Sequence, residues 1–146
     1  MRLMRVIDGG ITAPEGFKAA GRHIGIKKFK KDIALLTSDV PAKAAGVYTQ
    51  NLVKAAPVLW NSAITGNANA CTGEQGIKDN ELMAQAMAWL MGVKKEEILT
   101  AATGIIGLAM PMEKILKGIE ETYPELSPRR DSAKNAASGI ITTDTF

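Results

Sequence analysis

The pattern of apolar residues changes about halfway along the chain, and this change constrains the fold more than any other feature of the sequence. The first half has short apolar runs separated by glycine, proline and other turn residues, which is typical of strands. It predicts strands at 31–38 and 46–50 and a weaker one at 56–60. Turn residues make 8–21 an extended, irregular entry. Because helical spacing dominates the second half, we expect a mixed α/β (α+β) layered fold.

Three helices are predicted in the second half, with a strand between the first and the second. The predicted elements are a helix capped by Asp79 or Asn80 and ended by Gly92, a strand at 97–102, a helix from Pro111 to just before Pro124, a helix from Ser127-Pro128 to about Ser138, and a β-branched run at 140–143. Apolar residues at helical spacing are expected to form the core. They are Met83, Met87, Leu90 and Met91 in the first helix and Met112, Ile115, Leu116 and Ile119 in the second.

The composition fits one soluble domain over residues 1–146. The chain is 46% hydrophobic and 23% charged, and a domain of this size buries enough surface to fold without metals or disulfides. Cys71 is its single cysteine, which fits a reducing cytoplasm. The net charge of +3 is too small to indicate a nucleic-acid partner. Since the sequence has no signal peptide and no apolar run of ~18 residues, we expect no membrane partner either.

General catalytic patterns are almost absent. His23 is the single histidine, and no short spacing joins it to Cys71 or to carboxylates, so we expect no metal site. Cys71 is interpreted as a small buried thiol rather than as a nucleophile. The glycine-containing segment at 66–73 lacks the Gly-Lys-Ser/Thr ending of a phosphate-binding loop.

A cluster of basic residues leaves two interpretations open. It consists of Arg22, His23, Lys27, Lys28, Lys30 and Lys31. A solvated loop is the favoured interpretation, because Phe29 is the one aromatic residue interleaved with the charges. The other is a contact with a phosphate-bearing molecule, such as the phosphates of coenzyme A, or with nucleic acid.

Thr103-Gly104 follows the predicted strand at 97–102 and is the most suggestive local motif. A strand that ends in such a turn can direct a hydroxyl and a backbone N–H to one point, as in an oxyanion hole. A glycine turn between a strand and a helix is also an ordinary connection. The spacing alone favours the ordinary connection.

Several segments together resemble the ornithine acetyltransferases, also called glutamate N-acetyltransferases, of arginine biosynthesis. The most specific is Gly-Asn-Ala-Asn-Ala-Cys-Thr-Gly-Glu-Gln-Gly at 66–76. The others are 10–21, 38–59, 102–107 with Pro111-Met112, and Thr-Thr-Asp-Thr-Phe at 142–146. The resemblance spans almost the whole chain.

The resemblance implies a layered α-β-β-α sandwich, made as a precursor that cuts itself before a threonine. That threonine, on a partner β chain, would carry the acetyl group from N-acetylornithine to glutamate. In this chain, Thr103 and Gly104 match the oxyanion-stabilising pair and Thr142 matches a substrate-binding threonine, while the 67–76 segment matches a site-shaping turn. No cofactor is implied, although some members accept acetyl-CoA as donor. A heterotetramer of two α and two β chains in the cytoplasm is expected.

Two departures from the family pattern bear on these expectations. The sequence ends at Phe146, before the segment that carries the family's substrate-binding lysine and cleavage site. The connection at 61–65 is also shorter than usual. An isolated chain is therefore expected to be inactive. Two alternatives stay open: a self-cleaving amidohydrolase or aminopeptidase of similar architecture, and an inert folded fragment.

Overall fold

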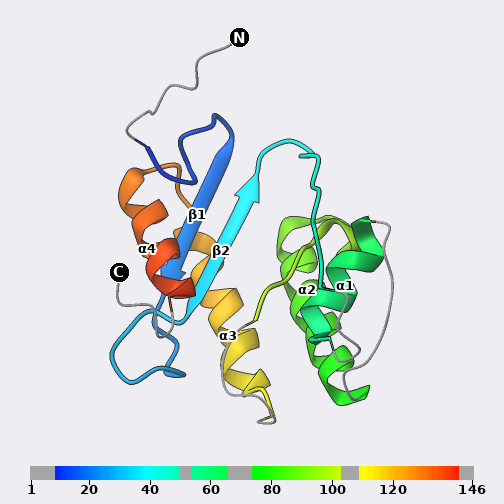
Figure 1. The fold of residues 1–146 in the computed structure, drawn as a ribbon. Coiled ribbons are helices and arrows are strands. Elements are labelled where there is room, and N and C mark those ends of the chain that lie inside the picture. The colour runs from blue at the N-terminus through cyan, green and yellow to red at the C-terminus, as the bar shows by residue number, and fades with distance from the viewer. Residues whose placement is uncertain (1–8, 50–53, 66–73, 103–108, 142–146) are drawn as a thin grey trace.

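A computed structural model describes residues 9–49, 54–65, 74–102 and 109–141. Figure 1 shows their arrangement, with two strands lying between helices. The elements are β1 (Phe17–Arg22), β2 (Ile33–Ser38), α1 (Ala56–Thr65), α2 (Glu74–Met91), the 3-10 helix η1 (Lys95–Glu97), α3 (Met112–Thr122), the 3-10 helix η2 (Tyr123–Glu125) and α4 (Arg130–Ile140). None of the helices described is long and apolar enough to cross a membrane.

The two strands form an antiparallel pair, in register from Phe17 opposite Ser38 to Arg22 opposite Ile33. Ala19 in β1 is fully buried, and it exchanges two backbone hydrogen bonds of 3.1 Å with Ser127 on the other side of the strand. The chain just before α4 therefore covers the outer edge of β1.

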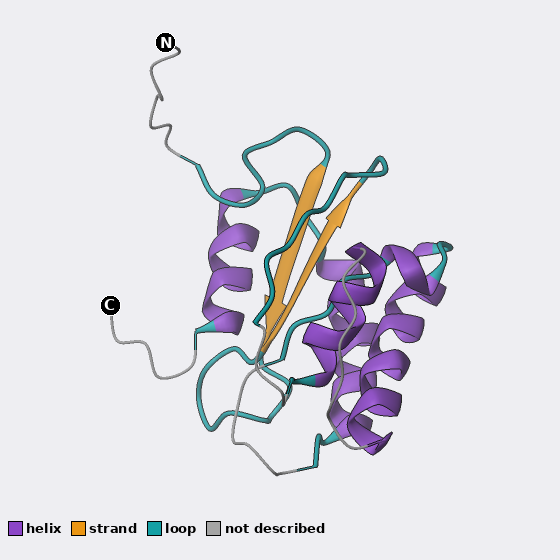
Figure 2. Cartoon of the chain, turned by 45° about the vertical axis from the view of Figure 1, so that its right-hand side comes forward, coloured by secondary structure: helices purple, strands orange, loops and turns teal. Residues whose placement is uncertain are grey.

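Helices cover both faces of the sheet, as Figures 1 and 2 show: α4 packs on one face, and α3 lies on the other, followed by α2 and α1. Contact with α4 is very close at Gly21, where an added Cβ would lie 2.1 Å from the carbonyl oxygen of Asn135. Only glycine leaves room for the backbones of β1 and α4 to approach in this way. The predicted mixed α/β class is confirmed, with one two-stranded sheet in the described part of the chain.

The core lies between α2 and α3 and reaches the sheet. Met87, Ile115 and Ile119 are buried at its centre. Partly buried apolar residues pack around them, among them Ile24, Ile33, Leu35, Met83, Leu90, Met91 and Met112. The helical stripes predicted from the sequence thus belong to the core, except Leu116, which is partly exposed and lies outside this cluster. Trp89, by contrast, is 79% exposed and lines a shallow groove between α2 and α3.

Three strand predictions were wrong. The run at 56–60 opens α1, with Pro57 in its first turn, where a missing N–H costs no helical bond. Residues 46–49 form no regular element, and of 97–102 only Glu97 is regular, as the end of η1. Short apolar runs do not separate a strand from other buried segments by periodicity alone.

Other boundaries also differ from the prediction. The expected irregular entry contains β1, whose residues 17–21 are paired. Helix α2 begins at Glu74, so Asp79 and Asn80 are buried inside it rather than capping it. It ends before Gly92 as predicted, and Gly92 has a φ of +68°, which favours glycine at a helix end. Helix α4 runs on through Gly139, so Ile140 is helical rather than extended.

Candidate functional site

The site residues predicted from the resemblance, Thr103, Gly104 and Thr142, lie outside the described residues, as do Cys71 and the 66–73 segment. The described chain reaches Ala102 on one side and Ile141 on the other. The structure therefore gives the two approaches to the predicted site: the segment before Thr103 and the end of α4 before Thr142. Each approach is fixed by a distinct set of side chains.

Side chains from α1 hold the first approach. The indole Nε1 of Trp60 donates a hydrogen bond of 2.7 Å to the carbonyl oxygen of Ile98. The amide of Asn61 binds the backbone of Thr100 twice: its Nδ2 donates to the carbonyl oxygen at 2.6 Å, and its Oδ1 accepts from the N–H at 2.9 Å. Asn61 thus makes the pair of bonds that a neighbouring strand would make.

Helix α2 adds a contact from Asn80, which is 2% exposed. Its Oδ1 accepts a hydrogen bond of 2.9 Å from the Thr100 hydroxyl, while its Nδ2 is buried and has no partner among the residues described. We call Asn61 and Asn80, together with the Thr100 groups that they bind, the Thr100 clamp. It ties two helices to a segment that ends three residues before Thr103.

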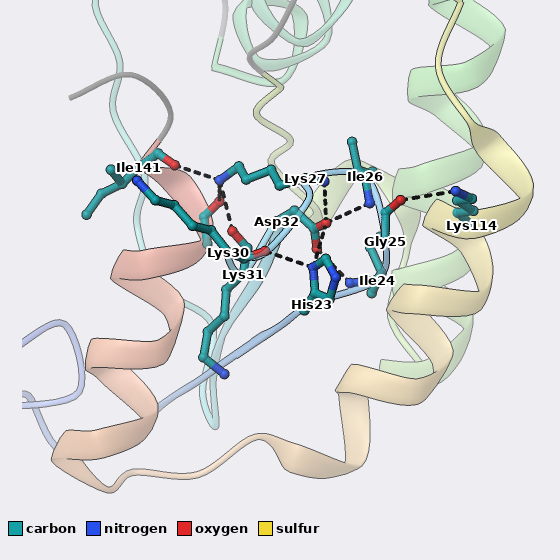
Figure 3. Close-up of polar contacts among 11 residues, drawn as sticks. His23, Ile24, Gly25, Ile26, Lys27, Lys30, Lys31, Asp32, Lys114 and Ile141 are labelled. Carbon is teal, nitrogen blue, oxygen red and sulfur yellow. Dashed lines mark hydrogen bonds and ion pairs between the residues drawn. The ribbon is translucent and has the colours of Figure 1, made fainter. Parts of the chain in front are cut away.

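Lys27 holds the second approach, at the end of α4 (Figure 3). Its Nζ donates to the carbonyl oxygens of Lys31 at 2.9 Å, Gly139 at 3.0 Å and Ile141 at 2.6 Å. An ammonium group has three N–H donors, so all are used. The last carbonyls of a helix lack intrahelical partners and are stabilised by a nearby cation. We call Lys27 and these three carbonyls the Lys27 latch.

Asp32 fixes the loop that carries Lys27. Its carboxylate, 1% exposed, accepts hydrogen bonds of 2.7–2.8 Å from the backbone N–H groups of Ile24, Ile26 and Lys27. His23 lies 3.2 Å away through its Nδ1. Burial acts to raise the pKa of Asp32, but the three backbone N–H groups and the nearby His23 outweigh it, so this pKa is lower than usual.

The structure favours the loop interpretation of the basic cluster. Besides Lys27, Lys31 donates to the Gly21 carbonyl at 3.0 Å and His23 contacts the Lys30 carbonyl at 2.8 Å. Arg22 pairs with Glu121 and Glu125. Two members, Lys28 and Lys30, are exposed and make no side-chain hydrogen bond or ion pair with the residues described.

No group of three His, Cys, Asp or Glu side chains lies close enough to hold a metal ion in the described part of the chain.

Comparison with known proteins decides the family. The model of the ArgJ family matches residues 18–146, most of the chain. The chain belongs to the ArgJ family. Among curated relatives, the arginine biosynthesis bifunctional protein ArgJ of Caldanaerobacter subterraneus is 45% identical over 98% of this chain and 38% of its own length. That of Symbiobacterium thermophilum is 47% identical over 98% and 39%. The chain thus spans less than two fifths of these ArgJ relatives.

Solved ArgJ structures have the same fold. The ornithine acetyltransferase of Mycobacterium tuberculosis, in complex with ornithine, matches with a TM-score of 0.86 and 38% identity over 94% of this chain and 81% of that chain. ArgJ of Bacillus halodurans matches with a TM-score of 0.85 and 32% identity, over 94% and 78%. The resemblance inferred from the sequence motifs is confirmed at the level of family and fold.

Sequence reasoning missed the Thr100 clamp and the Lys27 latch. Asn61 lies 39 residues from Thr100, and Lys27 lies 114 residues from Ile141. No local motif marks such pairs. The one signal in the sequence was that Lys27 belongs to the basic cluster. Such a cluster indicates positive charge, but it does not indicate which carbonyl groups Lys27 binds.

Proposed function

We propose that this chain is the α-chain part of an enzyme that transfers an acetyl group from N-acetylornithine to glutamate. The observation that carries the proposal is the match, at a TM-score of 0.86, to an ornithine acetyltransferase solved with ornithine bound. The family match over residues 18–146 and the names of the curated relatives support arginine biosynthesis as its setting.

The chemistry proceeds in two half-reactions. A threonine hydroxyl attacks the acetyl carbonyl carbon of N-acetylornithine and gives up its proton to a neighbouring amine, which acts as the base. The C–N bond then breaks, the leaving nitrogen takes the proton, and ornithine departs from an acetyl-threonine ester. The α-amine of glutamate attacks that ester, and the threonine oxygen regains a proton as N-acetylglutamate leaves.

In this scheme the chain supplies stabilisation and binding rather than the nucleophile. Thr103 and Gly104 donate hydrogen bonds to the negative oxygen of each tetrahedral intermediate, and Thr142 contacts the amino-acid substrate. One such donor lowers the barrier by about 3–4 kcal/mol. The reaction itself needs no metal and no cofactor, and acetyl-CoA is a second acetyl donor to be tested.

We place the nucleophilic threonine on a β chain cut from the same precursor, in a heterotetramer of two α and two β chains in the cytoplasm. Chain lengths support the cut: this chain covers 81% of the solved Mycobacterium tuberculosis chain but 38–39% of two curated ArgJ sequences. A solved chain is therefore much shorter than a curated sequence of the same family.

The test uses the full-length gene. Intact mass and N-terminal sequencing of the purified polypeptides should reveal a second chain that begins with threonine. Glutamate should accelerate the loss of N-acetylornithine and appear as N-acetylglutamate. A hydrolase of similar architecture would release acetate at a rate independent of glutamate, and an uncut, inactive protein would overturn the proposal.

The oxyanion assignment has its own test. Thr103→Ala should lower kcat about 100- to 1000-fold. Thr143→Ala, which alters the next residue after Thr142, is the comparison for substrate contact: Thr142→Ala should raise the KM for N-acetylornithine more than Thr143→Ala does. An undiminished kcat in Thr103→Ala would remove the oxyanion role.

A further inference from the structure

The segment from Ile98 to Thr100 begins in an extended conformation but has no strand partner among the residues that the structure describes. Ile98 has φ −105° and ψ 121°, which are strand values. The Ile98 N–H donates to the Lys95 carbonyl oxygen, but the Ile98 carbonyl oxygen and both backbone groups of Thr100 bond to side chains of α1, from Trp60 and Asn61. The segment is partly buried, and two neighbouring residues of one helix supply partners for three of its backbone polar groups.

Asn61 holds Thr100 with little freedom. Its planar amide donates and accepts at the same time, so the two bonds fix both the position and the direction of the Thr100 backbone. A single bond would leave the segment free to pivot about it. The second helix then adds the bond between the Thr100 hydroxyl and Asn80, and this bond fixes the side chain as well.

Asn80 carries an energetic cost that packing alone does not explain. Its amide is nearly fully buried in α2, and in the described part of the chain its Nδ2 lacks a partner. A buried donor without a partner is destabilising, and an apolar residue of similar size would avoid this. Residues that lower stability in this way are often kept for function. Within the residues that the structure describes, the one hydrogen bond of the Asn80 side chain is to Thr100.

We infer that Asn61 and Asn80 are positioning residues for Thr103 and Gly104, and that they act through Thr100. The inference rests on the proposed function of Thr103 and Gly104. Thr100 is the last residue before these two for which the described residues provide side-chain bonds, with Ala101 and Ala102 between. Donors in an oxyanion hole must meet the developing charge at hydrogen-bond distance, and a displacement of about 1 Å can cost about 100-fold in rate.

The experiment compares three variants of the full-length protein with the wild type. Asn61→Ala removes both backbone bonds to Thr100, and Thr100→Val removes the hydroxyl while keeping the volume of the side chain. Asn135→Ala is the matched control, since it deletes the same amide from the exposed face of α4. For each protein, kcat and KM for N-acetylornithine are measured, together with backbone amide hydrogen exchange at residues 98–102.

We expect Asn61→Ala to lower kcat about 10- to 100-fold and to change KM less than about 2-fold. Thr100→Val should lower kcat less, because the backbone bonds remain. Exchange should accelerate at Thr100 in Asn61→Ala and stay at the wild-type rate in the core helices. Asn61→Asp, which keeps the acceptor for the Thr100 N–H, should recover part of the lost kcat, while Asn135→Ala stays at the wild-type value.

Two results would overturn the inference. One is accelerated exchange at Thr100 with kcat within about 2-fold of the wild type. The other is a loss of activity in both Asn61→Ala and Thr100→Val that is accompanied by faster amide exchange across the whole chain. This result would indicate a purely structural role. Failure of the proposed function is recognised separately, by a wild-type protein without acetyl transfer or by a Thr103→Ala variant at the full rate.

Discussion

The two approaches to the predicted site are held by different chemistry. Neutral groups hold the segment before Thr103, through the amides of the Thr100 clamp. A charge holds the end of α4 before Thr142, through the ammonium group of Lys27, and the loop beneath it depends on the carboxylate of Asp32. Hydrogen bonds to charged groups are stronger than neutral ones but depend on ionisation. The clamp should therefore keep its geometry in acid, whereas protonation of Asp32 should loosen the loop that carries Lys27 and with it the latch.

Asp32→Ala should have the largest effect on this comparison. It leaves three backbone N–H groups without their acceptor, and water can replace the carboxylate at the exposed bond from Ile26. A hydrogen bond to a charged group contributes about 1.5–3 kcal/mol, so the two part-buried bonds predict a loss of about 3–6 kcal/mol of unfolding free energy. Urea denaturation measures it. Asp131→Ala, at a side chain that is 90% exposed, is the control and should change stability little. Equal effects in both variants would contradict the role of Asp32.

Lys27→Met should cost about 2 kcal/mol, because it removes the three carbonyl contacts but keeps an apolar stem of similar length. The end of α4 should fray, so amide exchange at 139–141 should accelerate while exchange at 98–102 stays unchanged. Lys117→Met, at a side chain that is 73% exposed, serves as the control. Faster exchange at both approaches would show that they are not independent.

Lowering the pH should weaken the second approach and not the first, without any mutation. The pKa of Asp32 is lowered by folding, so in acid the unfolded chain binds more protons than the folded one. The stabilisation from Asp32 is complete above the unfolded value of about 3.9 and is lost as the pH falls through the lower folded value. Asp32→Asn should flatten this part of the pH–stability curve. An identical acid limb in variant and wild type would assign the pH dependence to other carboxylates.

The ion pair between Lys18 and Asp39 should give the smallest effect. Its atoms lie 2.6 Å apart, but both side chains are well exposed, at 39% and 52%. Asp39→Asn should cost about 0.5 kcal/mol or less, and 1 M salt should reduce the difference, because its screening length of roughly 3 Å is close to the separation of these exposed charges. A loss above about 1 kcal/mol would mean that exposed charges contribute here as much as buried ones.

Local signals account for what could be predicted of the fold. Met87, Ile115 and Ile119 are core because their spacing within single helices places them on one face. Strand β1 was missed because Ala19, Ala20 and Gly21 have weak strand propensity, and the ladder with β2 that makes them a strand is not a local property. The run at 56–60 was assigned to a strand because a short, continuous apolar run has no period that distinguishes a strand from a helix.

The candidate site divides in the same way. Thr103, Gly104 and Thr142 could be named from the family motifs, because those motifs are continuous in sequence. The residues that hold their approaches could not, because each contact joins segments far apart in the chain. Asn80 illustrates the limit: from the sequence it was one of two possible helix caps, and its real partner, Thr100, lies 20 residues further on.

The 24–32 loop has the form of an anion-binding site in which the bound anion, the Asp32 carboxylate, belongs to the chain itself. Three converging N–H groups enclose a carboxylate, which is how proteins bind small anions. A free phosphate could bind these N–H groups only by displacing the Asp32 carboxylate. Asp32→Gly would remove that carboxylate, and added formate or acetate should then restore part of the lost stability in a dose-dependent way.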